Sequence, residues 1–137
     1  MPDSFSGRCA CGKIRYECSG APVLSVNCYC RDCQRASGSA YAADIVVNAA
    51  DWKLVSGKPN YFEQKADSGN IVSRGFCGDC GSPLFVKEVS MPDIVTINVG
   101  SLDDPGWYQP TVEWWTRSAQ PWVHMNPDTE KLETQPD

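Results

Sequence analysis

Seven of the eight cysteines fall into three short groups, and this grouping constrains the fold more than any other feature of the sequence. The groups are Cys9-Ala10-Cys11, Cys28-Tyr29-Cys30-Arg31-Asp32-Cys33 and Cys77-Gly78-Asp79-Cys80. Thiolates two or three positions apart can turn toward one ion where the backbone forms a tight loop, which neighbouring glycines permit. The spacing therefore predicts thiolate-bound metal, and zinc is the ion we expect.

A cysteine-rich chain could instead be linked by disulfides, and the cellular compartment decides between the two uses. The segment Met1–Ser6 has neither a basic start nor an apolar stretch, so we expect no signal peptide and a cytoplasmic protein. No apolar run reaches the length of about 18 residues that a membrane-spanning helix needs. In a reducing cytosol, clustered cysteines serve metal or redox chemistry. A thioredoxin-like role for Cys77 and Cys80 would need a βαβ context, which the sequence lacks.

Seven thiolates divide into four and three. A structural zinc is closed and four-coordinate, whereas a catalytic zinc has three protein ligands and one open position. We favour joining the two outer groups, which keeps every local group intact. The structural set is then Cys9, Cys11, Cys77 and Cys80, and the catalytic set is Cys28, Cys30 and Cys33. The sequence thus predicts two zinc ions per chain.

An alternative partition joins Cys30 and Cys33 with Cys77 and Cys80. The gap between Cys33 and Cys77 is much longer than the spacing of about 15–20 residues in paired zinc motifs. This partition also separates Cys28 from its own group. Cys18 stands alone, and we expect it to be a buried small hydrophobic residue.

Short segments rich in β-branched and aromatic residues alternate with turn signals along most of the chain. They are Lys13–Glu17, Tyr41–Val47, Tyr61–Lys65, Ile71–Phe76, Leu84–Val89 and Ile94–Val99. In the last of them Val95, Ile97 and Val99 share one parity, which indicates one buried face. Only Arg31–Ser37, ending at Gly38, is typical of a helix.

These patterns predict one all-β domain of short antiparallel strands over residues 1–125. Residues 126–137 are polar and contain two prolines, so we expect a loose C-terminal tail. The net charge is −5 and no basic run is present, which argues against nucleic-acid binding.

The cysteine groups and their flanking residues resemble the glutathione-dependent formaldehyde-activating enzyme family, which includes centromere protein V-like members. The similar segments are Gly7–Tyr16, Cys28–Ala40, Arg74–Ser82, Val99–Pro105 and Pro121-Trp122. The resemblance implies a tent-like arrangement of sheets, a structural zinc at the outer groups and a more exposed catalytic zinc at the central triplet. It also implies a carbon–sulfur lyase activity on glutathione and formaldehyde, which forms or cleaves S-hydroxymethylglutathione.

Two positions depart from the family's pattern. Tyr29 stands where members commonly have histidine, and Glu113-Trp114-Trp115 lies where a histidine is often present. We therefore predict action on glutathione or a similar small thiol, with formaldehyde or a related small electrophile. The alternative is a non-catalytic zinc protein that binds glutathione or serves as an interaction module.

Other side chains are candidates for a role in the reaction. The residues near the triplet that could move a proton are Tyr29, Asp32, Tyr41 and Asp44. Arg31 and Arg35 could contact a carboxylate of a glutathione-like ligand. His124, the only histidine, lies outside any ligand spacing, and we do not expect it to bind metal. The tryptophans are Trp52, Trp107, Trp114, Trp115 and Trp122; most should pack in the core, and one or two could line a pocket.

Overall fold

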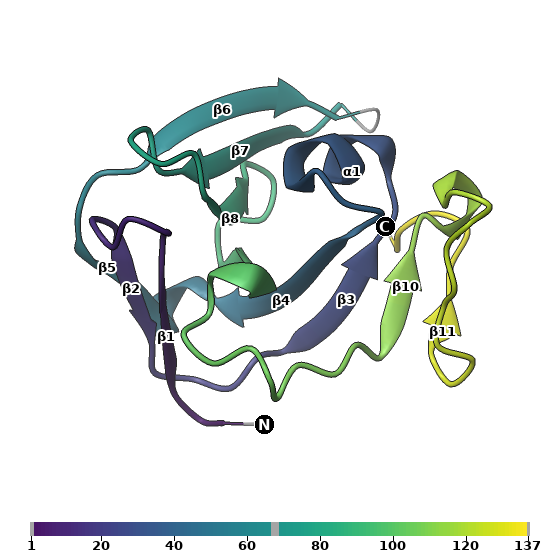
Figure 1. Ribbon diagram of the computed structural model, residues 1–137, viewed down its shortest axis with the longest axis horizontal. Coiled ribbons are helices and arrows are strands. Elements are labelled where there is room, and N and C mark those ends of the chain that lie inside the picture. The colour runs from purple at the N-terminus through teal and green to yellow at the C-terminus, as the bar shows by residue number, and fades with distance from the viewer. Residues whose placement is uncertain (1, 67–68, 137) are drawn as a thin grey trace.

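The computed structural model describes residues 2–66 and 69–136, and in these residues the chain folds into two β-sheets. The strands are β1 (Phe5–Arg8), β2 (Arg15–Cys18), β3 (Leu24–Cys28), β4 (Ala42–Asn48), β5 (Trp52–Ser56), β6 (Asn60–Lys65), β7 (Ile71–Phe76), β8 (Pro83–Glu88), β9 (Ile94–Asn98), β10 (Val112–Trp114) and β11 (Glu130–Lys131). The smaller sheet has the order β1-β2-β5, and the larger has the order β11-β10-β3-β4-β9-β8-β7-β6 (Figure 1). The prediction of a single all-β domain is confirmed.

The strands expected from their composition are present with boundaries shifted by two residues or fewer. The segment Ile71–Phe76 forms β7 over the same residues, whereas Lys13–Glu17 was expected where β2 spans Arg15–Cys18. The strands that the patterns missed are β1, β3, β5, β10 and β11. Each is only two to five residues long.

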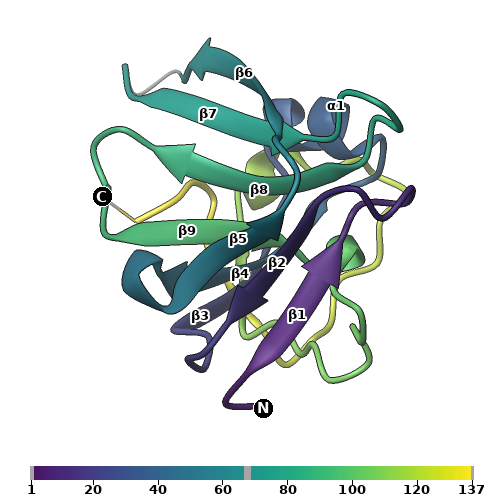
Figure 2. The same cartoon turned by 90° about the vertical axis from the view of Figure 1, so that its left-hand side faces the viewer.

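One face of the larger sheet packs against the smaller sheet and forms the hydrophobic core. Ile45, Val47, Val95 and Ile97 point into this core and are at most 2% exposed, and Tyr16 of the smaller sheet meets them there. The predicted parity of Val95, Ile97 and Val99 is therefore confirmed. Figure 2 shows the smaller sheet lying in front of the larger one. Burying a large apolar side chain contributes about 1.5–3 kcal/mol, so these contacts fix how the sheets stack.

The other face of the larger sheet curves around the helix α1 (Arg31–Ser37). In Figure 1 the helix lies between β6 and β7 at one end of the curve and β3 and β4 at the other. A 3.0 Å hydrogen bond from the amide of Gln64 in β6 to the carboxylate of Asp32 joins the two sides. The helix therefore occupies the concave side of the sheet.

The helix has the boundaries that the sequence predicts. At its start, the Cys30 sulfur accepts a hydrogen bond from the backbone N–H of Cys33. At its end, Gly38 has φ 64° and its N–H bonds to the carbonyl of Gln34. Glycine adopts this left-handed conformation without a steric penalty, which is why the helix ends there.

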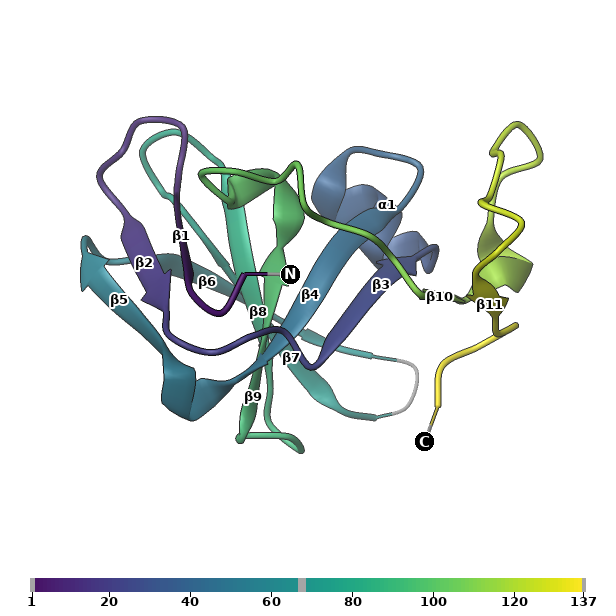
Figure 3. The same cartoon turned by 90° about the horizontal axis from the view of Figure 1, so that it is seen from below.

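The C-terminal segment differs from the expected loose tail. β11 pairs in parallel with β10, and β10 pairs in parallel with β3, so these two pairings also differ from the predicted antiparallel pattern. The N–H of Leu132 bonds to the carbonyl of Glu113, and the N–H of Trp115 bonds to that of Thr134. Figure 3 shows this segment beyond β3 at the edge of the sheet. The composition of this segment did not predict the pairing, because the strands with which it pairs lie far away in the sequence.

The expectation of a loose tail is therefore wrong for the segment from Glu130 to Thr134, while the domain boundary at residue 125 stays a prediction. Among residues 2–66 and 69–136, no helix is long and apolar enough to span a bilayer.

Candidate metal centres

The outer cysteine groups come together at one end of the molecule. The sulfur atoms of Cys9, Cys11, Cys77 and Cys80 all lie within 4.8 Å of one another. Cys9 and Cys11 follow β1, while Cys77 and Cys80 lie in the loop between β7 and β8. That loop is closed by a hydrogen bond from the N–H of Gly81, which has φ 78°, to the carbonyl of Cys77. The positive φ requires glycine at this position.

The sulfur separations fit a tetrahedral zinc ion. The sulfurs of Cys9 and Cys11 are 3.5 Å apart, and those of Cys11 and Cys77 are 3.7 Å apart. Thiolates that share one tetrahedral zinc, at about 2.3 Å each, lie about 3.8 Å from one another. All the cysteines are free thiols, so no disulfide competes for these sulfurs.

Contacts around the outer cluster join its two loops. The ammonium of Lys13 lies 3.2 Å from the carboxylate of Asp79, and the N–H of Ala10 donates to the hydroxyl of Ser82 over 2.9 Å. The Ser82 hydroxyl also lies 3.2 Å from the Cys80 sulfur. This hydrogen bond, together with backbone N–H groups, lowers the pKa of Cys80 to about 5. Cys80 therefore favours the thiolate form at neutral pH, whereas the neighbouring sulfurs raise the pKa of Cys11 to about 11.

The central triplet forms a second sulfur cluster. Cys28 ends β3, Cys30 caps α1 and Cys33 lies in the first turn of that helix. Their sulfur atoms also lie within 4.8 Å of one another. The structure thus groups the sulfurs as four and three, and it does not form the alternative set that mixes Cys30 and Cys33 with Cys77. That either cluster binds zinc stays a prediction.

Hydrogen bonds within the triplet concentrate negative charge on one sulfur. The thiols of Cys28 and Cys33 hydrogen-bond to the Cys30 sulfur and, with the N–H of Cys33 and the nearby Arg74 guanidinium, lower the pKa of Cys30 to about 3. The same bond with Cys30 is the largest cause that raises the pKa of Cys28. A dication with three thiolate ligands would displace the remaining protons.

The exposure of the two clusters differs from what the resemblance implies. Cys28 is buried and Cys30 and Cys33 are half-buried, whereas Cys11 of the outer cluster is exposed. The triplet is therefore not the more exposed of the two clusters. Its access to small molecules comes instead from an adjoining cavity.

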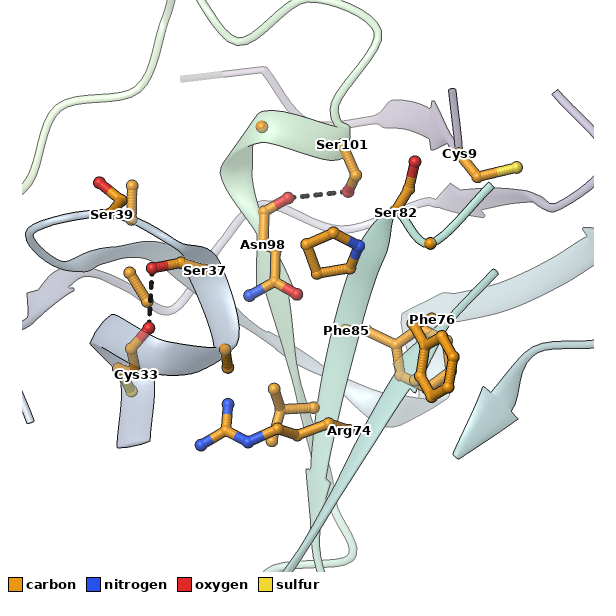
Figure 4. Close-up of a pocket in the computed structure, with 18 of the residues that line it drawn as sticks. Cys9, Cys33, Ser37, Ser39, Arg74, Phe76, Ser82, Phe85, Asn98 and Ser101 are labelled. Atoms are coloured by element: carbon orange, nitrogen blue, oxygen red, sulfur yellow. Dashed lines mark hydrogen bonds between the residues drawn. The ribbon is translucent and has the colours of Figure 1, made fainter. Parts of the chain in front are cut away.

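A cavity of about 1100 Å³ lies between α1, the strands β6–β9 and the loops that follow β1, β7 and β9. Cys33 lies on one wall and Cys9 on another, so the cavity extends from the triplet toward the outer cluster. Figure 4 shows Arg74 reaching across it toward Cys33, with Asn98 between the two walls. The cavity exceeds the range of about 300–1,000 Å³ that is usual for ligand sites, so it has room for a peptide-sized molecule.

Tyr29 points away from the cavity. Its side chain is 1% exposed, its hydroxyl donates a 2.7 Å hydrogen bond to Glu113, and its ring packs on Tyr41 at 5.1 Å between centroids. Burial and the carboxylate of Glu113 raise the pKa of Tyr29, so the phenol is neutral at physiological pH. Neither tyrosine lines the cavity.

The two aspartates among the candidate proton donors lie at different depths. Asp32 lines the cavity and accepts a hydrogen bond from Gln64. Asp44 is buried behind the cavity wall and accepts a 3.0 Å hydrogen bond from the amide of Asn98, which does line the cavity. Burial raises the pKa of Asp44 to about 7, against the lowering effects of Asn98 and Arg74.

The two candidate arginines near the triplet do not line the same set of cavities. Arg35 lines the main cavity, whereas Arg31 lines only a smaller one, of about 540 Å³, together with Trp122. His124 is exposed and belongs to neither sulfur cluster. Cys18 is 2% exposed and lies outside both clusters, which confirms its expected burial.

The tryptophans lie outside the main cavity. Trp52 packs on Phe85 with ring centroids 4.7 Å apart, and Trp107 packs on Phe5 at 5.5 Å, as expected for core residues. Trp122 is 65% exposed. The expectation that most tryptophans pack in the core therefore holds for Trp52 and Trp107, and fails for Trp122.

Arg74 and Asn98 line the cavity, and neither was predicted from the sequence to do so. Both lie in strands. In the sequence, Arg74 was noted only as part of a motif and Asn98 only as part of an alternating pattern. Asn98 shares the parity of Ile94 and Thr96, opposite to the core-facing set, and this was the one available signal. For Arg74 no local pattern pointed to the cavity.

Comparisons with known proteins show which family and which fold the chain resembles. The model of the family described as "Glutathione-dependent formaldehyde-activating enzyme" matches residues 4–118. A Halomonas elongata protein named "Putative glutathione-dependent formaldehyde-activating enzyme" is 29% identical over 103 residues. That match covers 72% of this chain and 66% of the relative, just under two thirds of its length.

A crystal structure of a Rhodobacter sphaeroides protein is similar in fold. Its TM-score is 0.54 at 24% identity, over 72% of this chain and 87% of that chain. This likeness shows a shared arrangement of strands.

Proposed function

Because the chain belongs to the glutathione-dependent formaldehyde-activating enzyme family, we propose that it is a zinc-dependent carbon–sulfur lyase. It joins glutathione or a similar thiol to formaldehyde or a related small electrophile, and it cleaves the same product in reverse. The observation that carries this proposal is the position of the cysteine triplet, which meets a large cavity at Cys33. A thiol held in that cavity would lie beside a set of sulfur ligands.

The donor sets support two zinc ions with different roles. Cys9, Cys11, Cys77 and Cys80 supply the four ligands of a closed structural site, and Cys28, Cys30 and Cys33 leave one position open. A zinc ion at the open site supplies a strong preference for the thiolate form of a substrate thiol at neutral pH. The hydrogen bond from the N–H of Cys33 fixes the orientation of the Cys30 sulfur.

The reaction needs the chain to orient two small reactants and to move one proton. The substrate sulfur attacks the carbonyl carbon, a C–S bond forms, the π bond of the carbonyl breaks, and the thiol proton ends on the new hydroxyl oxygen. Among the four candidates, Asp32 lines the cavity and is therefore the group that we assign to this transfer. The proposed compartment is the reducing cytoplasm, where free thiols persist.

The test is the rate of condensation of glutathione with formaldehyde, measured against the spontaneous rate. We expect zinc-loaded protein to accelerate it and Cys30→Ser to abolish the acceleration while remaining folded. Equal rates with and without the wild-type protein would contradict the enzyme proposal. Glutathione binding in that case would support the alternative of a non-catalytic thiol-binding protein. The absence of binding would support the alternative of an interaction module.

A further inference from the structure

The cavity beside the triplet has a cationic lining in an acidic protein. Arg8, Arg35 and Arg74 line it, with no lysine, while the whole chain carries a net charge of −5. Among the described residues, its carboxylates are Asp32 and Asp103. These cations therefore outnumber the anions of the cavity wall.

Both carboxylates of the wall are already used by internal hydrogen bonds. The Gln64 amide donates to Asp32 over 3.0 Å, and the Ser6 hydroxyl donates to Asp103 over 2.6 Å. Neither carboxylate forms an ion pair with an arginine of the cavity in the part of the chain that the structure describes. The arginines are consequently available to an anionic ligand.

Arg74 lines the cavity from the side opposite the helix that carries Cys33. It lies in the middle of β7, where it pairs with Phe62 on one side and Val86 on the other. Its guanidinium extends across the cavity toward the wall that bears Cys33 (Figure 4).

The donors of Arg74 lack partners within residues 2–66 and 69–136. The Nε atom is buried without a hydrogen bond, and no carboxylate lies within ion-pair distance of the side chain. A buried donor without a partner is costly, and a guanidinium fork matches a carboxylate with two parallel hydrogen bonds. Arg74 thus combines a place on the cavity wall with a buried Nε that has no hydrogen-bond partner among the described residues.

We propose that Arg74 binds a carboxylate of the thiol substrate and thereby makes the cavity selective for acidic thiols, such as a peptide thiol, over neutral ones. This inference rests on the proposed function, because it takes the cavity to be the thiol site. A rival role for Arg74 is to offset the charges of buried Asp44 and half-buried Glu88, because it opposes the rise in pKa that burial causes in both carboxyls. The two roles differ in whether the charge of the ligand matters.

The probe is S-methylglutathione, which keeps both carboxylates and has no free thiol, so its binding does not depend on turnover. Calorimetric titration of the full zinc-loaded chain should show binding that Arg74→Gln weakens about ten- to hundredfold, the usual effect of losing a charge-assisted bond. The dimethyl ester of the same probe should bind wild type and Arg74→Gln equally. Arg15→Gln is the matched control, since Arg15 is exposed on β2 outside the cavity and should change affinity less than twofold.

Equal affinity of wild type and Arg74→Gln for S-methylglutathione would overturn the inference, as would the absence of wild-type binding. An equal loss for the acid and its ester would overturn it as well, because it would indicate the structural role. If Arg74→Gln fails to fold, Arg74→Lys keeps the charge without the fork and should weaken acid binding but not ester binding. Acid-selective binding through Arg74 without acceleration of the condensation would refute the proposed reaction and leave the proposed role of Arg74 intact.

Discussion

The hydroxyl of Tyr29 donates a 2.7 Å hydrogen bond to the carboxylate of Glu113, across 84 positions of sequence. These residues stand at the two places where the resemblance to the family indicates a departure from its pattern. The carboxylate of Glu113 is 1% exposed and is also bonded by the hydroxyl of Thr129, with the ammonium of Lys131 at 3.9 Å. Tyr29, which lies between Cys28 and Cys30 in the sequence, therefore belongs to a buried network of polar contacts around Glu113.

We predict that Tyr29→Phe lowers the free energy of unfolding by about 1–3 kcal/mol, because it leaves the buried carboxylate of Glu113 short of a donor. Urea denaturation measures this change. The matched control is Tyr41→Phe, since the Tyr41 hydroxyl has no hydrogen bond in the described part of the chain; its effect should stay within about 0.5 kcal/mol. Equal effects of the two substitutions would contradict the importance of the network.

A second prediction concerns the C-terminal segment. Deleting residues 129–137 removes β11 together with Thr129 and Lys131, so Glu113 would keep only its bond with Tyr29. We expect a lower melting temperature and faster loss of metal from the triplet. Thr129→Val, which keeps the shape and removes the hydroxyl, should cost about 1 kcal/mol on its own. An unchanged melting temperature after the deletion would show that the segment is dispensable.

The two sulfur clusters should respond differently to the loss of one ligand. The outer cluster joins positions 66 residues apart, and closing such a loop costs about 4 kcal/mol plus a constant, which metal binding can offset. We therefore expect Cys77→Ser and Cys80→Ser to give insoluble protein and Cys30→Ser to give folded protein. Soluble yield and zinc content per chain measure this, with about two ions expected in wild type and about one in Cys30→Ser. Equal solubility of all three variants would contradict the division into structural and catalytic sites.

The buried carboxyl of Asp44 should make stability depend on pH. Burial raises its pKa from 3.8 to about 7, so between these values the folded chain holds a proton that the unfolded chain has released. Stability should therefore fall as pH rises from about 4 to about 7, by up to about 1.4 kcal/mol per unit, and then level off. Asp44→Asn cannot ionise and should lack this fall. Melting temperatures of both proteins between pH 5 and 8 test it, since metal-linked effects are shared and cancel in the difference.

The features that the sequence predicted are those governed by local patterns. The helix Arg31–Ser37 was predicted because Gly38 can adopt the left-handed conformation that ends it. The burial of Val95 and Ile97 follows from alternation along one strand. The two cysteine sets follow from spacing and from ordinary zinc coordination numbers.

The features that it missed depend on contacts between distant segments. β10 is three residues long and contains the buried charge of Glu113, so nothing local distinguishes it from a loop. Arg74 was read as part of a motif, because its position on the cavity wall depends on how β7 pairs with β6 and β8. In a sequence, a charged residue exposed on a sheet cannot be distinguished from one that lines a cavity until the pairing register of its strand is known.

The parallel pairing of β10 with β3 implies an order of assembly during synthesis. All four outer cysteines leave the ribosome before Val112, so the proposed structural site can form while the chain is still growing. The hydrogen bond between Tyr29, next to Cys28 and Cys30, and Glu113 can form only after β10 has emerged. Pairings between distant segments form slowly. We therefore expect the two proposed metal sites to form one after the other, with the proposed catalytic site completed last.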